Sequence, residues 1–157
     1  MAKQSAGLVL YRSRSSELEV LLVHPGGPFW QRKDEHAWSI PKGELEDEEP
    51  LAAAKREVAE EIGVRCEGDF IPLGSLKQAG GKLVHAWAIE QDFDPERLHS
   101  NSFELEWPPK SGRMRSFPEV DAANWFTIAQ ARQKILKGQL EFLDRLVAAV
   151  GTSDAAL

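Results

Sequence analysis

Short apolar runs and segments with helical spacing alternate along this chain. Two runs rich in apolar and branched residues, Ala6–Tyr11 and Leu18–His24, are joined by a short polar stretch, which predicts a β-hairpin or two adjacent strands. The same pattern predicts further strands over Ile71–Lys77, Lys82–Gln91, Ser102–Trp107 and Ala122–Phe126.

Helical spacing predicts helices over Pro50–Ile62, Ile128–Leu136 and Gln139–Val150. Pro50 suits the first turn of the first helix, and Gly63 suits its C-terminal cap. Strands and helices in this order predict an α/β fold in which helices cover both faces of a mixed β-sheet.

The predicted helix over Pro50–Ile62 separates an apolar stripe from an acidic one. The apolar stripe, which can pack on the sheet, consists of Leu51, Ala54, Val58 and Ile62. Glu57, Glu60 and Glu61 stand at positions i, i+3 and i+4, where carboxylates repel each other and the helix dipole disfavours anions. A divalent cation with oxygen ligands removes both penalties, whereas the alternative is an acidic face in contact with water.

A longer pattern surrounds these acids. Residues Arg56–Val64 read Arg-Glu-Val-Ala-Glu-Glu-Ile-Gly-Val, and Gly43 and Glu48 precede them. This pattern resembles the signature of the Nudix (MutT-like) hydrolases, in which Gly, five residues, Glu and seven residues precede Arg-Glu-apolar-any-Glu-Glu-any-Gly-apolar. Seven residues separate Glu48 from Arg56, but only four separate Gly43 from Glu48, so this loop is one residue short. Counting five residues on from Gly43 selects Glu49 instead, which leaves the spacing to Arg56 one residue short. We prefer Glu48 because loops tolerate deletions and helical registers do not.

The resemblance implies a Nudix-type α/β/α sandwich with a mixed β-sheet. We expect a single domain over residues 1–157, with the motif at about 43–64 and a flexible tail at 151–157. The segment 106–126 resembles a subset of bacterial Nudix proteins, a likeness that does not name a substrate.

The resemblance also assigns roles in the motif. It implies that Glu57, Glu60 and Glu61 hold magnesium together with the backbone carbonyl of Lys42, and Mn²⁺ could substitute. Glu57 could instead orient water as the general base. Arg56 would be structural, because it would pair with Glu48 and brace the loop.

Residues outside the motif are candidates for catalysis and substrate binding. Many family members use one further acid about six residues before a strand Trp, which selects Glu119, and Glu104 and Glu106 are its rivals. Lys42 and Arg113 are candidates to meet substrate phosphates. Among Phe29, Trp30 and Trp38, one could stack on a base, and Trp38 is our candidate.

Composition narrows the classes of partner. With 19 Lys and Arg against 25 Asp and Glu, the net charge of −6 argues against broad contact with a nucleic acid polymer. Cys66 is the only cysteine, so an internal disulfide and CxxC-type metal sites are excluded. No apolar run approaches the roughly 20 residues that span a bilayer, so we expect a cytoplasmic protein without a membrane partner. The oligomeric state is open, a homodimer included.

These observations predict a magnesium-dependent hydrolase, a pyrophosphatase that acts on a small nucleotide-like substrate. It would cleave the diphosphate linkage of a nucleoside diphosphate–X compound, such as a nucleoside triphosphate, a dinucleoside polyphosphate or a nucleotide sugar. Glu57 or Glu119 would accept the proton of the attacking water. The alternative is a non-catalytic Nudix-fold module that binds a nucleotide or serves regulation.

Overall fold

The computed structural model describes residues 3–151. Its strands are β1 (Gln4–Arg14), β2 (Glu17–Pro25), β3 (Lys42–Glu44), β4 (Ile71–Lys77), β5 (Leu83–Glu90), β6 (Ser102–Glu106), β7 (Met114–Pro118) and β8 (Val120–Thr127). Its α-helices are α1 (Pro50–Ile62), α2 (Ile128–Lys134) and α3 (Leu140–Val150). Short 3-10 turns lie at Ala79–Gly81, Pro95–Arg97 and Lys137–Gln139.

The larger sheet is mixed, as predicted. Its strands follow the order β4-β5-β1-β2-β8. β3 pairs with the start of β1, at Ser5 to Gly7, whereas β2 pairs with the end of β1. The pairing of β1 with β5 is parallel, and the other pairings are antiparallel. The predicted hairpin of β1 and β2 is therefore confirmed.

The two strands of this hairpin separate towards the start of β1, and the segment before α1 enters the gap. Ser39 exchanges two backbone hydrogen bonds with Val23 of β2, at 2.8 and 2.9 Å, while Lys42 and Gly43 pair with β1. A Cβ at Gly7 would lie 2.4 Å from the carbonyl oxygen of Pro41, so only glycine permits this close approach. This insertion places the start of the acidic motif inside the sheet.

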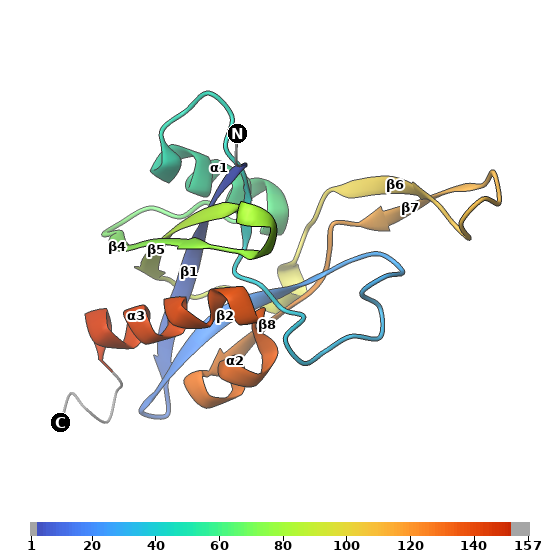
Figure 1. Ribbon diagram of the computed structural model, residues 1–157. Helices are drawn as coiled ribbons and strands as arrows, with labels where there is room; N and C mark the ends of the chain where they lie inside the picture. Colours follow the sequence, from blue (N-terminus) through green and yellow to red (C-terminus); the bar gives the residue numbers. More distant parts are fainter. Residues whose placement is uncertain (1–2, 152–157) are drawn as a thin grey trace.

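Helices cover both faces of the sheet (Figure 1), which confirms the α/β/α architecture. On one face α1 buries Ala53, Ala54, Val58 and Ile62 against β1 and its neighbours. On the other face α2 and α3 pack their apolar residues, Phe142 and Leu143 among them, against the strands. Burial of Val58 and Ile62, at about 2 kcal/mol each, stabilises the packing of α1 on the sheet despite its clustered acids.

Two strands were not predicted. β3 is only three residues long, and β7 reads Met-Arg-Ser-Phe-Pro, with charged and polar side chains in contact with water. β7 pairs with β6 in a separate two-stranded sheet, which projects from the larger sheet in Figure 1.

The remaining predicted elements match to within a few residues. α1 begins at Pro50 and ends at Ile62, and Gly63 adopts the left-handed conformation of a C-terminal cap. In the part of the chain that the structure describes, the helices lack the length and apolar character needed to cross a membrane. Residues 152–157 of the expected flexible tail lie outside the described residues.

Candidate active site

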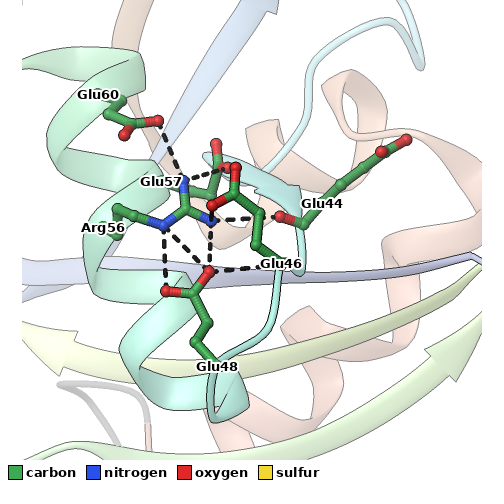
Figure 2. Close-up of polar contacts among 6 residues, drawn as sticks. All are labelled: Glu44, Glu46, Glu48, Arg56, Glu57 and Glu60. Atoms are coloured by element: carbon green, nitrogen blue, oxygen red, sulfur yellow. Dashed lines mark hydrogen bonds and ion pairs between the residues drawn. The ribbon is translucent and has the colours of Figure 1, made fainter.

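Arg56 binds acidic side chains of α1 and of the segment that precedes it (Figure 2). Its Nε donates to both oxygens of Glu48, at 3.0 and 3.1 Å, and its Nη2 donates to Glu48 at 2.5 Å. Its Nη1 donates to Glu57 at 2.8 Å and to Glu60 at 3.2 Å. These bonds confirm the predicted pairing of Arg56 with Glu48. They also lower the pKa of the Glu48 carboxyl and raise that of the guanidinium.

Glu57 lies directly over Gly43. A Cβ at Gly43 would stand 1.9 Å from Oε2 of Glu57 and 2.1 Å from its Cδ, so the carboxylate occupies the space that a side chain would take. Partial burial raises the pKa of Glu57, although the bond from Arg56 acts in the opposite direction. The glycine of the motif thus lets a carboxylate rest against the inserted backbone.

Glu61 points into a cavity at the point where the segment before α1 enters the sheet. Burial raises the pKa of its carboxyl to about 8, against the charge of Lys42 and a hydrogen bond from the Lys42 backbone. Glu119 stands near enough to raise this pKa further. Burial in turn lowers the pKa of the Lys42 ammonium, and Lys82 adds to this effect.

The cavity has a volume of about 210 Å³ and two chemically different parts. Lys42, Glu61 and Glu119 form its polar part. Its apolar part includes Trp30 and Leu136. Glu119 is held there by its backbone, because its N–H donates to Asn101 at 2.8 Å and its carbonyl accepts from Gly26 at 2.9 Å. The structure therefore brings together Glu61 of the motif and the predicted Glu119.

The three helical acids do not converge on one point. Glu61 faces the cavity, Glu57 lies between Gly43 and Arg56, and Glu60 is half exposed beside Arg56. Among residues 3–151, no group of three or more Asp, Glu, His or Cys side chains is arranged to hold a metal ion. In this arrangement Arg56 donates hydrogen bonds to two of the three carboxylates, those of Glu57 and Glu60.

The donor set still fits a hard divalent cation. Glu57 and Glu61 are adjacent carboxylates on one side of α1, and partial loss of water raises the pKa of both. A cation with oxygen ligands would offset this cost, and carboxylate and carbonyl oxygens are the ligands that magnesium prefers.

Other predicted residues lie elsewhere. Trp38 packs edge-on against His24 and Phe126 and donates its indole N–H to Asp34 at 2.8 Å, and it does not line the cavity. The aromatic residue of the cavity is Trp30. Arg113 is exposed in the loop between β6 and β7, where its carbonyl accepts from Trp107 at 2.9 Å.

The rival acids Glu104 and Glu106 sit on β6, exposed on the projecting hairpin. Glu106 accepts a hydrogen bond from the backbone of Lys110 at 2.8 Å, within the same hairpin. Glu119, in contrast, lines the cavity beside Glu61, so the geometry favours it over both rivals.

The protein family of this chain follows from a match to a known family model. The model of the NUDIX domain family matches residues 1–146. The chain belongs to the NUDIX family. Nudix proteins are pyrophosphohydrolases of nucleotide-like compounds and generally use divalent metal ions, so the predicted class of enzyme is confirmed.

Solved structures show the same fold at low sequence identity. A Caenorhabditis elegans Ap4A hydrolase in a binary complex is 22% identical, with a TM-score of 0.65, and the match covers 95% of this Nudix chain and 98% of that chain. The NUDIX domain of Shewanella oneidensis NrtR, complexed with ADP ribose, is 17% identical with a TM-score of 0.64, and the match covers 96% of this chain and 89% of that chain.

A mutT/nudix family protein from Listeria innocua is also 17% identical, with a TM-score of 0.62, and the match covers 94% of this chain and 93% of that chain. A comparison with curated protein sequences gives no match. At these sequence identities the structural matches show the fold alone, whereas the domain match over residues 1–146 shows the family.

Proposed function

We propose that this Nudix protein is a magnesium-dependent hydrolase that cleaves the diphosphate linkage of a nucleoside diphosphate–X compound. The observation that carries the proposal is the placement of Glu61. Its carboxylate is half-buried in a cavity, beside Lys42 and Glu119, and the cavity has an apolar part that suits the organic portion of a substrate.

Magnesium would be held by Glu57, Glu60 and Glu61 with the carbonyl of Lys42, and Mn²⁺ could replace it. The bound cation would neutralise the diphosphate and polarise its oxygens. Arg56 would keep the acids of α1 in position through the bonds already described. For Glu60 to join the ligands, its bond to Arg56 at 3.2 Å would have to give way.

Two acids of this chain remain candidates for the general base. Glu57 is tied to Arg56 at 2.8 Å and lies against Gly43, whereas Glu119 stands across the cavity on the segment that leads into β8. Either carboxylate would accept a proton from water that attacks a phosphorus atom. The ammonium of Lys42 would donate hydrogen bonds to phosphate oxygens in the same cavity.

A substrate screen with magnesium tests the proposal. The structural likeness to an Ap4A hydrolase and to a NUDIX domain complexed with ADP ribose selects those two compounds first, followed by nucleoside triphosphates and nucleotide sugars. We expect magnesium-dependent release of phosphate-containing products from at least one compound.

The matched variants are Glu61→Gln and Glu49→Gln. Both remove one acid at or near α1, but Glu49 is exposed and makes no side-chain cap to the helix. Glu61→Gln is expected to lower kcat at least about 100-fold, because it removes a ligand from the centre of the site, while Glu49→Gln stays near wild type. Nucleotide binding without magnesium-dependent turnover of any compound would instead support a non-catalytic binding module.

A further inference from the structure

A second cavity, of about 250 Å³, lies between the loop after β2 and the β6–β7 hairpin. Its chemically distinctive lining residues are Gln31, Trp107, Arg115, Phe117 and Asp121. The two cavities flank the same two segments. Pro25 and Val120 line the first, whereas Gly27 and Pro118 line the second. The two cavities therefore adjoin the same pair of segments, which the hydrogen bond from the Gly26 N–H to the Glu119 carbonyl joins.

Aromatic rings form one side of the second cavity. Trp107 and Phe117 are half-buried, and Phe29 packs edge-on against Trp107 with ring centroids 5.5 Å apart although 61% of its surface is exposed. The guanidinium of Arg115 lies 5.6 Å from the ring centroid of Phe117. Planar rings and a cation beside a cavity suit a flat aromatic ligand, which gains its affinity by stacking.

The carboxylate of Asp121 is held at this cavity by a buried histidine. His24 is only 7% exposed, and its ring nitrogens contact Oδ1 of Asp121 at 2.8 Å and the carbonyl oxygen of Lys33 at 2.7 Å. The two ring nitrogens of His24 thus bridge the carboxylate of Asp121 and the backbone of the loop after β2. Asp121 is thereby tied to the loop that forms the opposite wall.

A β-bulge gives Asp121 this orientation. The pairing of β2 with β8 passes from His24 and Ala122 to Pro25 and Val120, which leaves Asp121 without a partner residue in the ladder. Bulges commonly re-aim side chains next to binding sites. The bulge and the buried histidine together present the second oxygen of Asp121 as an acceptor at a fixed place.

We propose that the second cavity binds the base of the substrate, and that this base is a purine. The ring would stack on Trp107 and Phe117, and Asp121 would accept a hydrogen bond from an N–H of the base. Arg115 and Gln31 would donate to its ring nitrogens or carbonyl group. A purine is favoured because its two fused rings offer the larger stacking face. This assignment rests on the proposed function, since it extends the same substrate beyond the diphosphate.

Binding of nucleoside monophosphates to the full chain tests the proposal without hydrolysis. Isothermal titration in EDTA would compare AMP and GMP with CMP and with ribose 5-phosphate, which has no base. We expect AMP or GMP to bind at least about 10-fold more tightly than ribose 5-phosphate, with CMP in between.

Variants locate the base. Trp107→Ala is expected to weaken purine binding about 10-fold, and Trp107→Phe, which keeps a stacking ring, is expected to retain most of it. Asp121→Asn keeps an acceptor for His24 but replaces the free oxygen, so it should weaken binding similarly. Met114→Ala is the control, because Met114 is 59% exposed on the same hairpin and does not line the cavity.

The proposal is overturned if ribose 5-phosphate binds as tightly as the purine nucleotides. It is also overturned if Trp30→Ala abolishes purine binding while Trp107→Ala leaves it intact, because the base would then occupy the first cavity. Since neither magnesium nor turnover enters this titration, a failed hydrolysis screen would contradict the proposed function separately.

Discussion

Replacement of Gly43 by alanine isolates the position of the Glu57 carboxylate from its charge. The φ angle of Gly43 lies outside the left-handed region, so alanine can adopt its backbone conformation. The new Cβ would stand 1.9 Å from Oε2 of Glu57, whereas non-bonded atoms keep about 3 Å apart, so the carboxylate must retreat by about 1 Å. A misplacement of about 1 Å in a catalytic site can cost about 100-fold in rate.

We therefore expect Gly43→Ala to lower kcat about 100-fold at saturating magnesium, with a small loss in Tm because the bond from Arg56 to Glu57 is disturbed. The assay is the initial rate on whichever compound the screen shows to be hydrolysed, with Tm measured in parallel. Gly138→Ala is the matched control, because its Cβ would first meet the side chain of Gln78 at an ordinary 3.4 Å. Turnover of Gly43→Ala within about twofold of wild type would refute the reasoning, since the carboxylate of Glu57 would then have no required position.

Four further outcomes are expected. Magnesium at about 100 times its Kd should raise the Tm of the wild-type protein by about 5 °C and that of Glu61→Gln much less; equal shifts would place the ion elsewhere. In EDTA, folded Glu61 keeps its proton up to about pH 8 whereas the unfolded chain loses it near 4.5, so the free energy of unfolding should fall as pH rises through this window. In urea denaturation, the free energy of unfolding of Glu61→Gln should rise relative to that of wild type by about 3 kcal/mol between pH 5.5 and 8, and a constant difference would contradict the burial of this acid. Arg56→Ala should lower Tm by several degrees, because Glu48 and its neighbours lose their shared cation, while Glu49→Gln should not; similar melting of both variants would argue against the bracing role. Cys66 is 2% exposed and burial raises its thiol pKa to about 11, so it should react with a thiol reagent only on unfolding, and fast reaction of the native protein would show that the loop after α1 opens.

Local signals in the sequence were enough to place the helix of the motif and most strands. Pro50 and Gly63 bound α1 because both act on their own backbone, and the apolar stripe of Val58 and its neighbours decides which face packs on the sheet. The spacing of the acids follows from the same register. The pairing of Arg56 with Glu48 rather than Glu49 was also predictable, because it spans only eight positions along the chain.

Contacts between distant segments were decided by the tertiary structure. Glu61 and Glu119 share a cavity only because the segment before α1 enters the gap between β1 and β2 and the bulge in β8 sets the backbone beside it. The bond from His24 to Asp121 and the exclusion of Trp38 from the cavity depend on the same packing. A local pattern records which face of an element is apolar, but it carries no information on which distant residue will meet that face. That choice is made when the layers pack together and the backbone pairs across the sheet.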